Sequence, residues 1–391
     1  MRTYRELFRT PEFTPLFATA GLSVAASTVS GLALGILVHS ATGSPLLSAL
    51  AMFGPSLAQV VGALTLLSAA DRVRPRAATT GIAAGLAATT AVSALPGMPV
   101  WAIFAILGVE GLIASVAGGI RYGLLHEILA KDGYLLGRSV LNMAVGVVQI
   151  VGFALGGVLV ALLQPRGALL AAAALSTAAA IVARLRLTDR RPRATGRPSA
   201  AATLRVNARL WSSAPRRGVY LALWVPNGLV VGCESLYVSY DSDHAGLFFA
   251  CAAAGMLAGD TLAGRFLSRR WRERLGAPLR LLLAAPYLLF ALAPPLFAAL
   301  AAVTLASLGY AAGLLLQERL LELTPEELTG QALGLHSSGM LALQGIGALT
   351  AGTIAELTTP ATAMATAAAA SLAVTAALAP RLRARRPVVS A

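Results

Sequence analysis

Three carboxylates lie inside long apolar runs of the sequence, where an acidic side chain is unusual: Glu110, Glu234 and Asp260. An ionised side chain within a hydrocarbon interior is costly, so such residues usually pair or mark a path for ions or substrates. Glu110 lies near the middle of its run, with no basic residue at the same depth. It is therefore predicted to exchange protons or bind a cation; the alternative is a neutral, hydrogen-bonded packing residue.

Glu234 follows two polar residues at helical spacing. Asn227 lies two helical turns before it, and Trp224 lies one turn further. A carboxylate, an amide and an indole on one helical face could line a cavity for a drug-sized molecule. The alternative places Glu234 at the membrane interface, together with Tyr237 and Tyr240, because tyrosines are common at that depth.

The remaining polar residues of the apolar runs suit cavity lining or hydrogen bonding between helices. Asp260 precedes Arg265 by five residues, and we expect the two to pair at a membrane edge. The amides predicted to face a cavity, or to bond between helices, are Gln59, Asn142, Gln149 and Gln344.

The composition is that of a membrane protein. Of the 391 residues, 57% are hydrophobic and only 12% are charged, whereas soluble domains carry about 25% charged residues. The net charge of +14 fits basic cytoplasmic loops better than nucleic-acid binding. The two cysteines both lie in apolar runs, so the sequence predicts neither a disulfide framework nor a metal site.

Twelve apolar runs are predicted to cross the membrane as helices, because about 20 residues at 1.5 Å per residue span a hydrocarbon core of about 30 Å. The predicted spans are 15–38, 45–69, 77–95, 99–120, 137–163 and 167–187, then 218–240, 243–266, 277–293, 295–317, 331–355 and 360–379. The connections after the fourth and tenth spans are each predicted to hold a short amphipathic surface helix.

The polar segment 188–217 separates two six-span halves, 1–187 and 218–391. Its content of Arg, Pro, Ala and Ser predicts a mobile cytoplasmic tether. With both termini cytoplasmic, only Arg166 of the 31 basic residues falls in an outside loop. This asymmetry predicts a multi-pass protein of the cell membrane with both ends inside.

An internal repeat relates the two halves. A shift of 195 residues places Glu127 on Glu322 and the pattern Q-x-x-G-x-x-x-x-G, which begins at Gln149, on the same pattern beginning at Gln344. Because six spans separate the copies, both insert in the same orientation, as parallel-repeat transporters do.

The plan and its motifs resemble the major facilitator superfamily. The loop after the second span, AADRVRPR, is similar to that family's motif A; Asp71, Arg72 and Arg76 match it. The resemblance implies that these charges latch the halves at the cytoplasmic face; the alternative is a solvated loop.

A second motif lies in the fifth span. GVVQIVGFALGGVL resembles the family's antiporter motif, which Gly152, Gly156 and Gly157 match; close helix packing is the alternative explanation. The segment 318–352 is similar to the macrolide, multidrug and siderophore exporter branch of the superfamily.

The resemblance implies an all-α integral membrane fold, two six-helix halves around a central cavity, working by alternating access without enzymatic activity or a cofactor. The predicted function is export of a small amphipathic molecule by proton antiport, with Glu110 and Glu234 as candidate acids. Proton-coupled nutrient uptake, or a non-transporting membrane sensor with the same fold, are the alternatives. The predicted partners are the substrate, protons and the lipid bilayer, with no nucleic acid, and the chain is expected to act as a monomer.

Overall fold

The computed structural model describes the chain except residues 1–3, 67–72, 130, 192–199, 268 and 384–391. The first half holds α1 Tyr4–Arg9, α2 Phe13–Thr42, α3 Pro45–Leu66, α4 Pro75–Ser93, α5 Val100–Ile128 and α6 Lys131–Arg186. Helix α7, Ala200–Ser212, precedes the second half, which holds α8 Ala214–Glu234, α9 Tyr237–Tyr240, α10 Ala245–Thr261, α11 Arg269–Leu282, α12 Leu296–Leu308, α13 Ala312–Glu322, α14 Thr329–Leu357 and α15 Pro360–Arg383. Short π-helical and 3-10 turns are η2 Leu262–Phe266, η3 Ala285–Leu292, η4 Gly309–Ala311 and η5 Glu326–Leu328.

Ten helical stretches of the described chain are long and apolar enough to cross a membrane. One of them, Leu136–Arg186, contains two predicted spans, because α6 continues through a kink at Gln164. Helix α4 is not among the ten, but its 19 residues occupy the third predicted span. The twelve predicted spans therefore fall largely on helical structure, with 67–69 outside the described residues. Helices are expected there because hydrocarbon offers the backbone no hydrogen-bond partner.

The breaks between spans follow from local backbone chemistry. Helix α2 ends at Gly43, whose φ of 66° is left-handed and whose N–H bonds to the carbonyl of His39 at 2.7 Å. The kink in α6 lies at Gln164, with φ of 62°, immediately before Pro165, because a residue before proline is disfavoured in the helical region. These breaks reverse the chain and set consecutive spans side by side.

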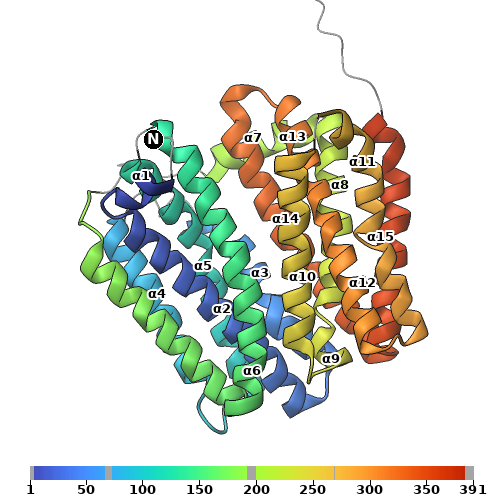
Figure 1. The fold of residues 1–391 in the computed structure, drawn as a ribbon, viewed down its shortest axis with the longest axis horizontal. Coiled ribbons are helices and arrows are strands. Elements are labelled where there is room, and N and C mark those ends of the chain that lie inside the picture. The colour runs from blue at the N-terminus through green and yellow to red at the C-terminus, as the bar shows by residue number, and fades with distance from the viewer. Residues whose placement is uncertain (1–3, 67–72, 130, 192–199, 268, 384–391) are drawn as a thin grey trace, which may run out of the picture.

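The two halves lie next to each other, coloured blue to green and yellow to red in Figure 1. We call the polar segment 188–217 the linker. The end of the molecule that carries α1 and α7 is the linker face, and the opposite end, which carries α9, is the far face. The helices of the two halves converge toward the far face in this view. Extensive contacts join α3 to α14 and α6 to α10 across the halves.

The repeat seen in the sequence corresponds to equivalent close approaches in the two halves. Gly152 packs against α2, and its counterpart Gly347 packs against α8, in each case the first spanning helix of the same half. Gly157 packs against α10, and its counterpart Gly352 packs against α3, in each case a helix of the other half. The glycine pairs therefore hold each half together and join it to the other.

Two sequence predictions need correction. The predicted surface helices are absent from the described chain: α5 continues to Ile128 and α13 to Glu322, so the membrane helices themselves extend to these loops. The predicted tether contains α7, whose Leu210 is fully buried. Val206 and Leu210 are four residues apart and so share one face of the helix, which packs on α8 and α14 of the second half. This part of the segment is therefore helical.

Candidate functional site

Three hydrogen bonds between described residues join α8 to α14, and we call them the seam. They link Tyr220 to Ala332, Trp224 to His336 and Asn227 to Gln344. Near the linker face, the Tyr220 hydroxyl donates to the carbonyl of Ala332 at 3.2 Å. One turn further, the Trp224 Nε1 donates to Nδ1 of His336 at 3.2 Å, and both side chains are buried. Because the partner numbers rise together along both helices, α8 and α14 run parallel.

The middle of the seam is an amide pair. Gln344 Nε2 donates to Oδ1 of Asn227 at 3.1 Å, and Asn227 is only 8% exposed. The helices approach closely here, because Gly347 lies directly against the backbone of Gly228. Each amide still has unused hydrogen-bonding capacity, so the pair can exchange its mutual bond for bonds to a ligand.

Glu234, the last residue of α8, lies beyond the seam toward the far face. Its Oε1 accepts a hydrogen bond of 2.9 Å from the Tyr310 hydroxyl. Tyr237 and Tyr287, both fully buried, share a hydrogen bond in the same region. The polar residues predicted to share one face of α8 thus have partners on different helices. Asn227 bonds to α14, whereas Glu234 bonds to Tyr310 of the tenth predicted span.

An aromatic chain connects this region to the other half. The Tyr237 ring lies 4.9 Å from the Phe249 ring, and Phe249 stacks on Phe153 of α6 at 4.8 Å between centroids. Tyr237 is three residues after Glu234, so two successive ring contacts, Tyr237 with Phe249 and Phe249 with Phe153, connect the region of the carboxylate to the other half.

Glu110 is held by the neighbouring span instead. Its Oε1 accepts hydrogen bonds from the hydroxyls of Thr89 at 2.7 Å and Thr90 at 3.3 Å, both on α4. This arrangement fits the hydrogen-bonded packing alternative for Glu110. The acid forms no hydrogen bond with the described residues of α8 or α14.

The other predicted amides are dispersed. Asn142 is exposed and accepts a hydrogen bond of 2.9 Å from Tyr122 of α5. Gln59 and Gln149 are partly exposed, and neither bonds to a described residue. Of the amides predicted to face a cavity, only Gln344 and Asn227 are brought together.

The predicted gating residues also separate. Asp71 and Arg72 lie outside the described residues, and the Nε of Arg76 is buried without a hydrogen-bond partner in the described chain. Asp260 and Arg265 form no ion pair with each other: Asp260 is on α10, whereas Arg265 lies within the π-helical turn η2.

The glycines of the fifth span act in packing. A Cβ on Gly152 or Gly156 would meet side chains of α2 at 3.1 to 3.4 Å, and one on Gly157 would meet the Cα of Gly246 at 3.3 Å. These contacts fit the packing alternative, and the contact of Gly157 with Gly246 lies between the two halves.

A contact that the sequence did not reveal closes the far face. Oε2 of Glu356, near the end of α14, accepts the Ser44 hydroxyl at 2.7 Å and the Leu46 N–H at 3.3 Å. The carboxylate of one half thereby caps the first turn of α3 in the other half, where helix amides favour negative charge. Its only sequence signal is an acid at the end of an apolar run.

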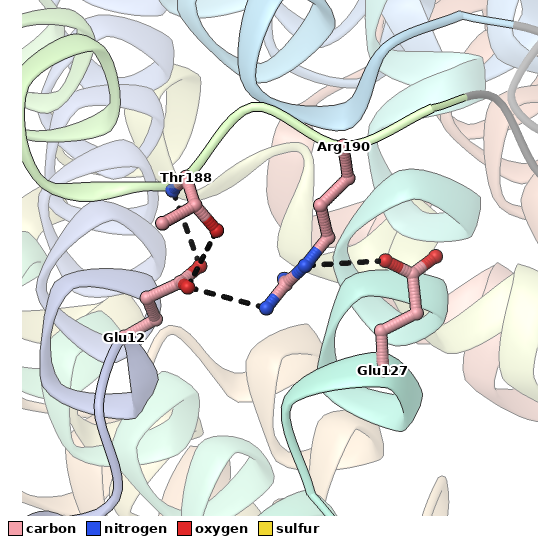
Figure 2. Close-up of polar contacts among 4 residues, drawn as sticks. All are labelled: Glu12, Glu127, Thr188 and Arg190. Atoms are coloured by element: carbon pink, nitrogen blue, oxygen red, sulfur yellow. Dashed lines mark hydrogen bonds and ion pairs between the residues drawn. The ribbon is translucent and has the colours of Figure 1, made fainter.

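A second unforeseen cluster lies at the linker face (Figure 2). Arg190 bridges Glu12 at 3.2 Å and Glu127 at 3.7 Å. Thr188 donates its hydroxyl to Glu12 at 2.6 Å and its N–H at 3.3 Å. Within the part of the chain that the structure describes, the start of the linker therefore bonds only to the first half.

A scan against protein families matches residues 16–240, more than half of the chain, to the Major Facilitator Superfamily. The chain belongs to the Major Facilitator Superfamily. It is thus a multi-pass membrane transporter of a class that carries small molecules across the bilayer. No curated protein sequence matches it.

Solved structures of superfamily fold are similar over nearly the whole chain. A POT family transporter in complex with a thioalcohol conjugated peptide has a TM-score of 0.78 at 10% identity, covering 95% of this chain and 96% of that one. The nucleoside transporter NupG has a TM-score of 0.72 at 14% identity, covering 94% and 100%. A bacterial homolog of the human lysosomal transporter Spinster, inward-facing and unoccupied, has a TM-score of 0.68 at 15% identity, covering 98% and 95%. At these identities the similarity shows the fold.

Proposed function

We propose that this transporter exports a small amphipathic molecule in exchange for protons, with the seam as part of the substrate site and Glu234 as the coupling acid. The observation that carries the proposal is the position of Glu234. Its carboxylate lies at the end of the seam helix, has one described hydrogen bond, from Tyr310, and is three residues before Tyr237, the first ring of the aromatic chain that reaches the other half.

The chemistry of the seam selects the substrate class. An indole, an imidazole and two amides offer neutral donors, acceptors and aromatic faces. Neither α8 beyond Arg217 nor α14 contains lysine or arginine, so the seam lacks the fixed positive charge that phosphorylated substrates need. A neutral or cationic molecule with an apolar body fits these groups.

The contacts between the halves support a direction of access. The Glu356 cap, Gly157 against Gly246 and Gly352 against Leu46 all hold the halves together toward the far face. The linker face is the cytoplasmic one, because the basic residues concentrate in its loops. Substrate therefore enters from the cytoplasm in this conformation, and proton binding accompanies the return from the opposite one.

The test uses purified protein in liposomes with a pH-sensitive dye inside. A panel of amphipathic cations and neutral drugs is added, and substrate-dependent proton movement is recorded against empty liposomes. Antiport predicts that substrate and protons move in opposite directions. Movement of both in the same direction indicates symport, and substrate binding without flux indicates a non-transporting protein; either result overturns the proposal.

Orientation has its own measurement. Reporter fusions at residue 200 and after residue 385 are expected to be cytoplasmic, and one at residue 164 external. An external signal at residue 200 contradicts the assignment of the linker face.

A further inference from the structure

An alanine-rich groove of about 760 Å³ runs between α4 and the second part of α6. Its floor consists of buried alanines, among them Ala87, Ala173 and Ala180. Exposed apolar side chains, such as Ile181, form its rim. Figure 1 places α4 and this part of α6 along the outer edge of the first half. In a membrane-spanning bundle, such a groove faces lipid acyl chains.

The groove ends in polar groups near the linker face. The Arg184 guanidinium lines it, is exposed, and pairs with no described residue. Thr80 also lines it, and the oxygen of its hydroxyl is buried with no hydrogen-bond partner in the described chain. Arg76, one turn earlier on α4, has a buried Nε that is likewise unpartnered.

The hydroxyl of Thr80 differs from those of several other span threonines. Thr28 donates to the carbonyl of Val24, one turn earlier, at 2.7 Å. Thr177, which lines the same groove, does so to Ala173 at 2.8 Å. Thr80 makes no such bond, but its hydroxyl oxygen is buried, so the charged group of this lining that is accessible to a ligand is Arg184.

The depth of Arg184 fits a lipid headgroup. The residue lies 20 positions after the kink at Gln164, which is about 30 Å along a helix and about the thickness of the hydrocarbon core. Its charge is thus at the membrane–water boundary, while the alanine floor lies within the acyl region. Basic pockets between spanning helices on the cytoplasmic side are suited to anionic lipid headgroups.

We propose that this groove binds one anionic phospholipid from the leaflet at the linker face. An acyl chain lies along the alanine floor, and the phosphate contacts Arg184. The site lies on the outside of the first half, in α4 and α6, and it shares no residue with the seam. The inference therefore does not depend on the substrate or the coupling ion.

The experiment is native mass spectrometry of the purified full chain after equilibration with phosphatidylglycerol and phosphatidylcholine of identical acyl chains. We expect one retained phosphatidylglycerol. Arg184→Gln should lower its occupancy about fivefold, the effect expected for one basic side chain at an anionic surface. The matched control is Arg186→Gln, which removes the same charge two residues away from an exposed side chain that does not line the groove.

A second variant tests the groove without altering charge. Ala84→Phe places a large side chain at an exposed position of the groove lining, so it should displace the acyl chain and reduce retention. Ala161→Phe, at an exposed position of α6 outside the groove, is its control. Equal losses in Arg184→Gln and Arg186→Gln would show general charge attraction, and unchanged retention in Ala84→Phe would show an empty groove. Equal retention of both lipids would contradict the headgroup preference; each of these results overturns the proposal.

Discussion

Glu110 and Glu234 are the same residue type in similar apolar runs, but their surroundings differ. Glu110 accepts two threonine hydroxyls from the adjacent helix α4, so its hydrogen bonds stay within one helix pair of the first half. Glu234 accepts one tyrosine hydroxyl from a distant span, beside buried tyrosines that lead to the other half. Both acids lie within predicted spans, so depth in the membrane does not distinguish them; their hydrogen-bond partners do.

Backbone packing does not follow the same contrast. Around the seam, helices touch backbone to backbone at Gly347 and Gly228. Next to Glu110, a Cβ added to Gly111 would clash with the carbonyl oxygen of Pro55, whereas one added to Gly108 would meet nothing within 4 Å. The helix of Glu110 is therefore closely packed on its Gly111 side and open on its Gly108 side, so close packing alone does not separate the two acids.

The largest expected effect is on folding. Gly347→Leu forces a side chain into the Gly228 backbone, which cannot move without separating α8 from α14. It should abolish monodisperse protein after detergent extraction, since even modest overpacking costs about 1–3 kcal/mol. Gly108→Leu, the matched control in α5, should extract and unfold as the wild type does. A stable Gly347→Leu protein would contradict the packing assigned to the seam.

The next effect is on coupling. Glu234→Gln keeps the size and an acceptor for Tyr310 but cannot release a proton, so substrate-driven proton flux in liposomes should fall to the level of empty liposomes. Substrate binding should persist. Glu110→Gln should retain flux, because an amide can also accept from Thr89. Loss of flux in Glu110→Gln alone would reverse the roles of the two acids.

A smaller effect is expected in the seam. Trp224→Phe keeps an aromatic ring but removes the donor to His336; the loss of about 1 kcal/mol should raise the half-saturating substrate concentration about fivefold. Trp211 stacks on the same ring, 5.6 Å away, without a described hydrogen bond. Trp211→Phe is therefore the control, and equal effects in both variants would assign the change to stacking instead of the hydrogen bond.

The smallest effect concerns the far-face cap. Glu356→Ala removes the acceptor of the Leu46 N–H, and an exposed charged bond contributes about 1 kcal/mol or less. Hydrogen exchange of the first turn of α3 should accelerate by up to about fivefold. Glu327→Ala, an exposed acid of η5, should leave that exchange rate unchanged. No acceleration in Glu356→Ala would show that the cap does not restrain the far face.

The sequence predicts the helices well because apolar run length, proline and glycine act locally. It also predicts the repeat, since Gly152 and Gly347 recur at a fixed shift. The sequence does not predict which polar residues pair. Asn227 and Gln344 are 117 positions apart, and their pairing depends on the register of two helices. Glu356 and Arg190 are similar cases, because their partners belong to other helices and nothing in the local sequence specifies them.

The cluster of Figure 2 has a consequence for the continuity of the polypeptide. Thr188 and Arg190 are bonded to acids of the first half, whereas Trp211 stacks against Tyr220 and Trp224 of the second. Each end of the linker is thus attached to a different half. A break introduced between residues 191 and 200 would leave both attachments within their own fragment. Two co-expressed fragments should then reassemble into a working carrier, with covalent linkage contributing only local concentration.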